Sequence, residues 1–496
     1  MSETRSNPYD RLSYPTHAHA QTHPDRLATM AKLFGMTPAP VERCRVLELG
    51  CGDGWNLIPM AFTLPESEFL GVDLAAAPIA RGCDIISALE LKNVRLVALN
   101  IMDFDGAFGE FDYIVAHGLY AWVPEPVRDK ILAIAKAHLS PQGVAFVSYN
   151  TNPAGRMRQV LREMMTFHAG SIENPLERVE QGRALLELIA VCRHEPDVWL
   201  DLMRHQVASL AGRPAEVVYY DEFAEVYAPV YFHEFAAHAA RQGLQYLSEA
   251  QFAEMQAEFA EPEAQQKLRE LSGGDVLRYE QYLDFAKFRK FRQTLLCHAG
   301  ITLDRSLQPA RLRGLFVSSA AVQVTPPSGA SPDTERFEIP NGPGASTNNP
   351  VVKSVLRRLI DRWPQSVRFE DLTPLADEQV LAEVLLTLYG ATLVEFHACQ
   401  PPIAAEAGPR PEASRLARLQ ARTQRLVTTL RHSQVEISDD TSRHVLQLLD
   451  GTRDRNALLD ALATHCLSTP RATLAAQLEQ NLAELVRLGL LVDGRS

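Results

Sequence analysis

RVLELGCGDG (residues 45–54) joins a short apolar run to three glycines at alternate positions, Gly50, Gly52 and Gly54. Glycine lets the backbone turn sharply and approach a ligand closely where a side chain would collide. A helix that starts after such a turn also offers unpaired N–H groups. We therefore expect a strand, a glycine turn and a helix, with a small polar ligand bound at the turn.

Four more apolar runs follow at regular intervals, and each ends at a polar residue or a glycine. They are EFLGV (68–72), VRLVAL (94–99), FDYIVA (111–116) and GVAFVSY (143–149). Continuous apolar runs that alternate with helical segments are typical of parallel strands covered by helices on both faces. The sequence predicts an α/β fold with a Rossmann-like, doubly wound sheet.

The rest of the chain is expected to form an insertion into this α/β domain and further domains after it. The composition from about 155 to 218 is helical, which predicts a helical insertion, and a helix that stops at Gly243 precedes one further strand. Residues 325–350 are rich in Pro, Gly, Ser and Asn and read as a linker or an exposed excursion. The expected domains are 1–305 with the insertion at 155–218 and a further segment at about 219–300, a middle helical domain at 306–400, and a mainly helical, winged-helix-like domain at 401–496.

Composition limits the function classes. The chain has 496 residues, is 46% hydrophobic and carries 49 basic and 61 acidic side chains, which gives a net charge of −12. This balance excludes disorder of the whole chain and argues against nucleic acid as a partner. The seven cysteines form no C-x-x-C pair, and no apolar stretch is long enough for a signal peptide or a membrane span. We expect a cytoplasmic protein without membrane insertion and without a metal.

The spacing of the glycines indicates which ligand binds. Asp73 ends the second apolar run 23 residues after Gly50, where a carboxylate can accept the hydroxyl hydrogens of a ribose. A dinucleotide fingerprint reads G-x-G-x-x-G, whereas this turn reads G-x-G-x-G. The pattern therefore favours S-adenosylmethionine over NAD.

E-x-G-x-G-x-G with an acidic end to the second strand resembles the class I S-adenosylmethionine-dependent methyltransferases. Residues 9–36, 227–250 and 291–298 are similar to bacterial methyltransferases that carry a methyltransferase regulatory domain, among them rickettsial outer-membrane-protein lysine methyltransferases. The resemblance implies a methyltransferase domain with the regulatory motif at about 219–300. It also implies an N-terminal segment that folds over the cofactor.

The cofactor residues are carried over on this resemblance and on their places at strand ends. The expected set is Tyr9, Tyr14, His23, Glu48, Gly50, Gly52, Gly54, Asp73, Asn100, Ile101, Asp103 and His117. His23 precedes a proline and could equally be a helix-start device without a ligand. His117 could accept a proton or be a loop histidine bonded to the backbone. His17 and His19 have no cysteine or carboxylate cluster beside them, so we do not expect them to bind a metal.

The acceptor site is expected at the ends of the fourth and fifth strands. A lysine nucleophile must be neutral, which desolvation favours, and aromatic walls exclude water while they tolerate a methylated ammonium. Tyr120, Trp122 and Tyr149 are the candidates for such walls, with ordinary packing as the alternative. Asn150 and Asn152 could orient the amine.

The expected activity is N-methylation of protein lysine. Two alternatives stay open: a small-molecule methyltransferase, and a regulatory or interaction protein that binds the cofactor only for structural reasons. The many apolar residues of the insertion predict a homodimer contact. At spacings of three, four and three, Arg415, Arg418, Arg422 and Arg425 are expected to share a helix face, which is either a solvated basic face or a docking surface for an acidic partner.

Overall fold

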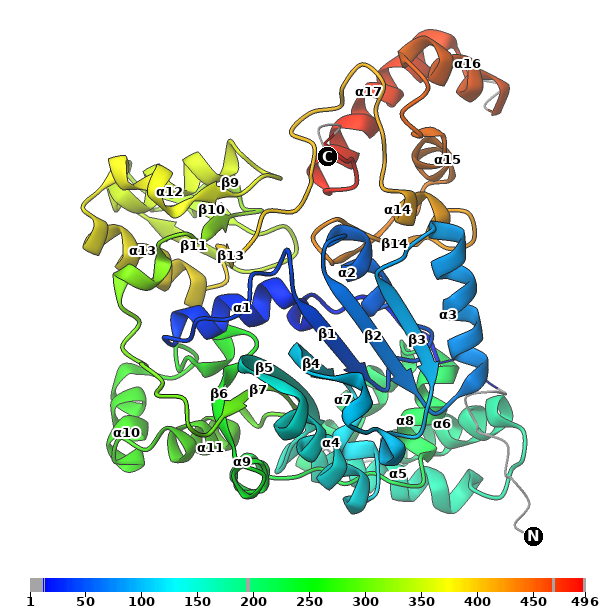
Figure 1. Ribbon diagram of the computed structural model, residues 1–496, viewed down its shortest axis with the longest axis vertical. Coiled ribbons are helices and arrows are strands. Elements are labelled where there is room, and N and C mark those ends of the chain that lie inside the picture. Colours follow the sequence, from blue (N-terminus) through cyan, green and yellow to red (C-terminus); the bar gives the residue numbers. More distant parts are fainter. Residues whose placement is uncertain (1–11, 13, 193–196, 466–468, 494–496) are drawn as a thin grey trace.

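A computed structural model describes the chain except residues 1–11, 13, 193–196, 466–468 and 494–496. Its centre is a seven-stranded sheet in the order β3-β2-β1-β4-β5-β7-β6, in which β7 runs antiparallel to both of its neighbours (Figure 1). The strands are β1 (Arg45–Leu49), β2 (Glu68–Asp73), β3 (Val94–Ala98), β4 (Phe111–Ala116), β5 (Leu139–Asn150), β6 (Leu244–Glu249) and β7 (Phe291–His298). The predicted strands are all present, and the expected α/β class is confirmed.

Helices cover both faces of the sheet, as the continuous apolar runs require. Successive residues of β4 alternate between two cores: Tyr113 and Val115 lie in one, Ile114 and Ala116 in the other. The first core is covered by α1 (Pro24–Leu33), α2 (Leu57–Thr63) and α3 (Ala76–Leu89), and the second by α4 (Glu125–His138) and α9 (Phe232–Arg241). Two further helices, α10 (Pro262–Ser272) and α11 (Val276–Lys287), lie between β6 and β7 in the chain.

The order of the strands places the ligand site. β1 has β2 on one side and β4 on the other, so the direction of winding reverses at β1. In open α/β sheets the crevice at this point, outside the carboxyl ends of the strands, is where ligands bind. The glycine turn follows β1 directly and therefore lies at this edge.

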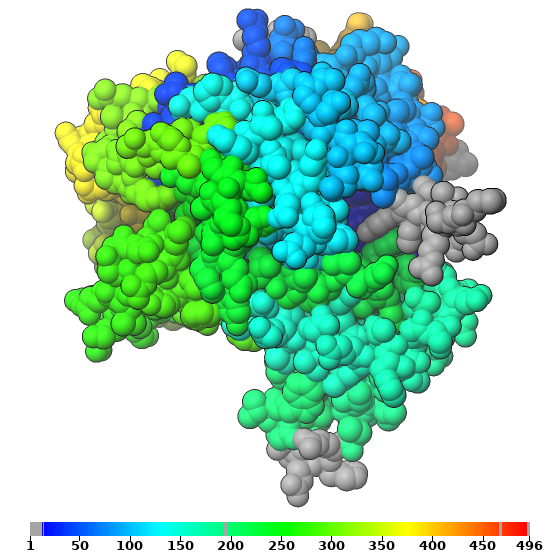
Figure 2. All heavy atoms as spheres, turned by 60° about the horizontal axis from the view of Figure 1, so that its bottom comes forward, coloured from blue at the N-terminus to red at the C-terminus, as the bar shows by residue number. Residues whose placement is uncertain are grey.

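The insertion consists of α5 (Ala154–Ala169), α6 (Pro175–Val191), α7 (Val198–Ala211) and α8 (Ala215–Phe223). These helices have a small core of their own, which includes Leu161, Met165, Val179, Leu186 and Met203. Figure 2 shows the insertion as a lobe that projects from the body of the molecule. Because it projects, much of its surface has no cover from the rest of the chain.

The middle region shares the first core of the sheet and contains more strand than expected. It is built from β8 (Phe316–Ser318), β9 (Val322–Val324), β10 (Glu335–Glu338), β11 (Gly344–Thr347), α12 (Pro350–Ile360), β12 (Val367–Arg368), α13 (Glu378–Gly390) and β13 (Glu395–His397). The stretch predicted as a linker or excursion thus holds the β10–β11 hairpin. Phe337 anchors this hairpin because its side chain is fully buried in the core.

The C-terminal region has a separate core under α15 (Asp440–Leu448), α16 (Arg455–His465) and α17 (Arg471–Arg487). Before these helices come α14 (Arg415–Gln420) and the hairpin β14 (Leu426–Thr428) and β15 (Gln434–Glu436). The expected arginine face is wrong, because α14 ends at Gln420 and Arg422 falls in a turn. Arg415 forms an ion pair with Glu90 instead.

Short 3-10 helices complete the chain. They are η2 (Ala20–Thr22), η3 (Ile101–Asp103), η4 (Gly106–Phe108), η5 (Tyr120–Trp122), η6 (Phe252–Met255), η7 (Pro309–Leu312) and η8 (Phe369–Leu375). None of the helices that the structure describes has the length and apolar character needed to cross a bilayer.

Gly82 on α3 lies against the glycine turn, so we expect Gly82→Ala to destabilise the protein. A Cβ there would lie 2.5 Å from the carbonyl oxygen of Asp53 and would also strike Leu96. Helix propensity alone favours alanine by up to about 1 kcal/mol, but overpacking against backbone costs about 1–3 kcal/mol. Denaturant unfolding should therefore give a lower free energy of unfolding for Gly82→Ala than for the unchanged protein. Gly212→Ala is the matched control, since a Cβ at Gly212 meets no described atom within 4 Å.

Candidate active site

The glycine turn adopts a backbone that other residues rarely adopt. Gly50, Gly52 and Gly54 have φ values of +74°, +57° and +79°, in the left-handed region that favours glycine. The N–H groups of Gly50 and Cys51 donate to the carbonyl oxygen of Val72 at 2.8 and 3.2 Å, which holds the turn against β2. The expected glycine turn is therefore present at the carboxyl edge of the sheet.

Asp73 lies at the end of β2 beside this turn. Its Oδ2 accepts the N–H of Gly52 at 2.9 Å and its Oδ1 accepts the N–H of Ala75 at 2.8 Å. These two bonds fix the carboxylate next to the turn. A carboxylate oxygen can accept more than one hydrogen bond, so a carboxylate at this place suits a ribose diol.

Glu48 is the buried acid of the site. Its side chain is 4% exposed, and Oε1 accepts a hydrogen bond from Asn56 Nδ2 at 2.7 Å. No described residue donates to Oε2. The pKa of Glu48 is raised to about 8, mainly by burial and also by the nearby Asp73, while the bond from Asn56 opposes both. A buried acceptor without a hydrogen-bond partner costs free energy. This oxygen is therefore suited to bind a hydrogen-bond donor or a cation of a ligand.

The residues at the turn fit S-adenosylmethionine. Glu48 Oε2 would take the methionyl ammonium, which is a cation with N–H donors. Asp73 would take the ribose hydroxyls, and the positive-φ glycines leave the backbone open to close approach. Each of these groups would meet a complementary group of the cofactor.

The N-terminal segment lies against the turn. Thr16 Oγ1 donates to Asp53, and the N–H of His19 donates to Asn56 Oδ1 at 2.9 Å. Tyr14 lies beside Tyr220 of the insertion with 5.8 Å between ring centroids, and burial raises the pKa of Tyr14 to about 12. Tyr9 lies outside the described residues.

His23 occupies the N-cap of α1, where its Nδ1 accepts the N–H of Asp25 at 3.1 Å. Its ring lies 5.1 Å from that of His432 in the C-terminal region. The structure thus shows His23 in the helix-start role that the sequence left open, and a contact between His23 and the cofactor stays a prediction.

Three histidine rings form a column at the end of β4. The ring centroids of His17 and His19 are 4.3 Å apart, and those of His19 and His117 are 3.9 Å apart. His117 Nδ1 lies 3.0 Å from Ser148 Oγ, which accepts the N–H of Gly118 at 2.7 Å. Burial lowers the pKa of His117 to about 4 and that of His19 to about 2. The rings are therefore neutral near pH 7, and no metal-binding cluster of three or more such residues occurs in the described part of the chain.

Asn100, Ile101 and Asp103 lie at the end of β3, next to the end of β2. Asn100 Oδ1 caps η3 by accepting the N–H of Met102 at 3.0 Å. Ile101 is buried and Asp103 is exposed. An adenine contact from this segment remains a prediction.

The aromatic candidates divide into two groups. Tyr120 and Tyr149 are 2% and 1% exposed, and both rings pack against Phe235 of α9. Their hydroxyls meet His238 Nδ1 at 2.7 Å and Thr294 Oγ1 at 3.1 Å. The structure therefore packs both rings in the core and does not place them in an open channel.

Trp122 is partly exposed and faces the insertion. Its ring lies 5.0 Å from that of Tyr227, and the guanidinium carbons of Arg158 and Arg162 lie 5.1 and 5.5 Å from it. Arg158 is held in turn by Glu222, at 2.7 Å. The sequence did not predict this stack of two aromatic rings and two arginines, because its members come from three separate segments of the chain.

Asn150 ends β5 and Asn152 follows two residues later, each with a buried amide oxygen. They are 8% and 6% exposed, and neither Oδ1 has a donor among the described residues. Asn152 Nδ2 donates to the carbonyl oxygen of Pro229 at 3.0 Å, which fixes the amide. Two buried acceptors at the carboxyl end of one strand suit a ligand that carries N–H groups.

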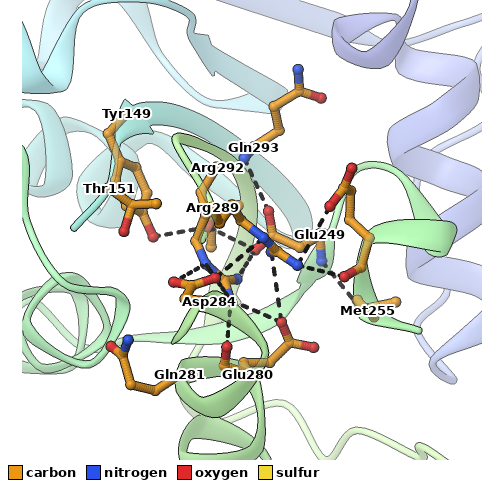
Figure 3. Close-up of polar contacts among 12 residues, drawn as sticks. Tyr149, Thr151, Glu249, Met255, Glu280, Gln281, Asp284, Arg289, Arg292 and Gln293 are labelled. Atoms are coloured by element: carbon orange, nitrogen blue, oxygen red, sulfur yellow. Dashed lines mark hydrogen bonds and ion pairs between the residues drawn. The ribbon is translucent and has the colours of Figure 1, made fainter. Parts of the chain in front are cut away.

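A buried ion-pair cluster lies behind Tyr149. Arg292 of β7 is its centre, with Glu249, Glu280 and Asp284 around the guanidinium (Figure 3). Arg292 pairs with Tyr149 across β5 and β7, and Thr294 joins the Tyr149 hydroxyl to Glu249. The cluster thus supports the strand that carries Asn150.

Comparison with known proteins identifies three matching segments. Residues 47–145 match a methyltransferase domain, residues 214–298 a predicted methyltransferase regulatory domain, and residues 409–483 the PKMT C-terminal winged helix domain. The last two segments cover the ion-pair cluster of Arg292 and most of the C-terminal core.

Two curated relatives come from Rickettsia prowazekii, and both are uncharacterized proteins. One is 31% identical over 483 residues, which cover 92% of this chain and 86% of the relative. The other is 38% identical over 243 residues, which cover 49% of this chain and 97% of the relative. The first relation spans almost the whole chain.

A solved structure extends the relation to the fold. PKMT2 from Rickettsia typhi in complex with AdoHcy has 29% sequence identity and a TM-score of 0.86, over 96% of this chain and 99% of that chain. AdoHcy is S-adenosylmethionine after loss of its methyl group, which agrees with the fit of the glycine turn. The protein is an enzyme of the S-adenosylmethionine-dependent methyltransferase family that carries a methyltransferase regulatory domain and a PKMT C-terminal winged-helix domain.

Proposed function

We propose that this methyltransferase N-methylates lysine side chains of proteins. The observation that carries the proposal is the pair of buried, unpaired amide oxygens of Asn150 and Asn152 at the end of β5. An amine that approaches this edge carries N–H groups that such oxygens can accept. The similarity to PKMT2 over nearly the full chain supports a protein lysine as the acceptor.

The residues of this chain orient the two reactants and exclude water from them. S-adenosylmethionine would supply a methyl group on a sulfonium sulfur, which is transferred to the amine nitrogen while AdoHcy leaves as a neutral thioether. Asn150 and Asn152 would hold the amine by its N–H groups and leave the lone pair free. The histidine column is neutral and adds no charge at this edge, which favours a neutral amine. Orientation of the two reactants supplies the main catalytic effect.

Incubation with methyl-labelled S-adenosylmethionine and a fractionated lysate tests the proposal. We expect label in protein, recovered as methyllysine after complete hydrolysis. Label found only in small molecules would reject lysine and support the small-molecule alternative. Cofactor binding without transfer to either pool would support a regulatory role.

Trp122→Ala should separate acceptor binding from cofactor binding. Trp122 packs on Tyr227 and on the arginines of the insertion, whereas the described contacts of the glycine turn do not include it. We expect turnover to fall roughly ten- to hundredfold, because the acceptor loses its fixed geometry, while calorimetry shows nearly unchanged cofactor affinity. Phe259→Ala, an exposed aromatic on another surface, is the control. Turnover equal in the two variants would contradict the role of Trp122.

The homodimer predicted from the insertion is part of the proposal. Phe167, Leu188, Val191 and Val198 are 94%, 61%, 70% and 86% exposed on α5, α6 and α7. Apolar surface of this extent is a mark of an interface, and a second copy of the chain would cover it. Sedimentation at micromolar concentration should give a dimer, and Leu188→Glu should shift it towards monomer. A monodisperse monomer of the unchanged protein would reject this contact.

We also propose a cytoplasmic location. The cysteines that the structure describes are free thiols: Cys44, Cys51, Cys83, Cys192, Cys297 and Cys399. Free thiols persist in a reducing compartment. Cell fractionation with an antibody to the protein tests this location.

A further inference from the structure

Asn56, the residue before α2, joins three distant parts of the chain. Its side-chain Oδ1 accepts the N–H of His19 at 2.9 Å and lies 3.1 Å from His432 Nε2. Its Nδ2 donates to Glu48 Oε1 at 2.7 Å and to Thr22 Oγ1 at 3.0 Å. The amide is 5% exposed. The N-terminal segment, the C-terminal region and the acid of the cofactor site therefore meet at one side chain.

The partners fix the orientation of this amide. A backbone N–H can only donate, so the atom that meets His19 must be the Asn56 oxygen. The Asn56 nitrogen then faces Glu48, and His432 must donate from a protonated Nε2. Burial lowers the pKa of His432 well below its usual value. The ring is thus neutral and carries its hydrogen on Nε2.

His432 is held rigidly in the loop between β14 and β15. Its side chain is 2% exposed, its φ is +57°, and its N–H donates to Thr429 O at 3.0 Å. The preceding Arg431 reaches into the middle region, where it donates to Ser318 Oγ at 3.4 Å and to Pro364 O. The loop is therefore wedged between the middle region and the glycine turn.

We propose that His432 is a positioning residue for cofactor binding, which acts through Asn56 on Glu48. The winged-helix region then influences the cofactor affinity through the contact between His432 and Asn56. This inference rests on the proposed role of Glu48 towards the cofactor ammonium. It gives the C-terminal region a function beyond packing.

The charges around Glu48 explain why the hydrogen bond from Asn56 matters for the pKa of this carboxyl group. Asp73 on β2 raises the pKa of Glu48, and so does burial, while the bond from Asn56 lowers it. Of the other titratable groups near the site, burial keeps the Cys51 thiol protonated and the His19 ring neutral. Loss of the bond from Asn56 should thus raise the pKa of Glu48, so that Glu48 ionises at a higher pH.

A pair of substitutions tests the inference on the full-length protein. His432→Leu removes the donor, whereas His432→Gln keeps an N–H near the same place. S-adenosylhomocysteine is the probe, and calorimetry from pH 6 to 9 gives its dissociation constant without turnover. For His432→Leu we expect affinity to fall roughly three- to tenfold, the worth of one buried hydrogen bond, with the pH midpoint displaced upwards. His432→Gln should restore both.

His444→Leu is the control for general loosening of the C-terminal region. This histidine lies on α15 in the same region, stacked on His465 and away from Asn56. A pH midpoint that stays unchanged in His432→Leu, or that moves as far in His432→Gln or His444→Leu as in His432→Leu, would overturn the inference. Glu48→Gln separates this failure from that of the proposed site: if Glu48→Gln binds like the unchanged protein, the role of Glu48 itself is wrong.

Discussion

Glu48→Gln is expected to weaken the binding of S-adenosylmethionine roughly 30-fold or more at pH 8.5. The substitution keeps the shape of the side chain but removes the charge that would meet the methionyl ammonium. Truncation of one partner of a buried, hydrogen-bonded charge pair costs about 2–5 kcal/mol, and 1.4 kcal/mol is about tenfold in affinity. Calorimetry with S-adenosylhomocysteine measures the change without interference from turnover.

The pH dependence gives the same prediction a second, sharper readout. With a pKa of about 8, Glu48 is protonated at pH 6 to 7 when no cofactor is bound. A bound ammonium favours the ionised carboxylate, so binding releases a proton below pH 8. Affinity should therefore rise with pH by up to about tenfold per unit and level off near pH 8. In Glu48→Gln this slope should disappear.

Proton release is measured by titration in two buffers that differ in ionisation enthalpy. Glu68→Gln is the matched control, because Glu68 is an exposed glutamate at the start of the neighbouring strand β2. It should keep both the affinity and the slope. If Glu48→Gln keeps them too, the ammonium is bound elsewhere.

The parts of the molecule that the sequence predicted are those that local physics determines. A strand such as FDYIVA has apolar side chains on both faces, and both faces must be buried. β4 and its neighbours were therefore predictable. The glycine turn was predictable because positive φ values restrict the residue type. Asp73 followed from its place at the end of a strand.

The parts that the sequence did not predict depend on contacts between distant segments. Asn56 and His432 are 376 positions apart, and nothing near either residue indicates that the two regions dock. Tyr149 looked like a channel residue because an aromatic ring at a strand end suits a channel or a core equally. Phe235 on α9 stacks on the Tyr149 ring, so this ring is part of the core.

Arg292→Met should cause the largest loss of stability, about 3–5 kcal/mol in the free energy of unfolding. Arg292 is among the largest fully buried side chains, and its guanidinium contacts Glu249 at 2.5 Å, Glu280 at 3.0 Å and Asp284 at 2.8 Å (Figure 3). Methionine removes the charge and leaves the cluster with Arg289, a buried cation that pairs with Glu280 and Asp284. Uncompensated buried charge of this kind is costly even where the original cluster contributed little net stability.

Acid should reduce the loss, and the sign follows from proton binding. Burial already raises the pKa of Glu280 and of Asp284, and removal of Arg292 raises both further. The folded variant then binds more protons than its unfolded chain, so its stability increases as pH falls. Denaturant unfolding at pH 8 and pH 5.5 should therefore show a smaller difference from the unchanged protein at pH 5.5. Arg278→Met, an exposed arginine on α11, should unfold like the unchanged protein at both pH values. An Arg292→Met variant as stable as Arg278→Met would mean that the carboxylates find other partners, and that Arg292 does not hold β7 against the strand that carries Asn150.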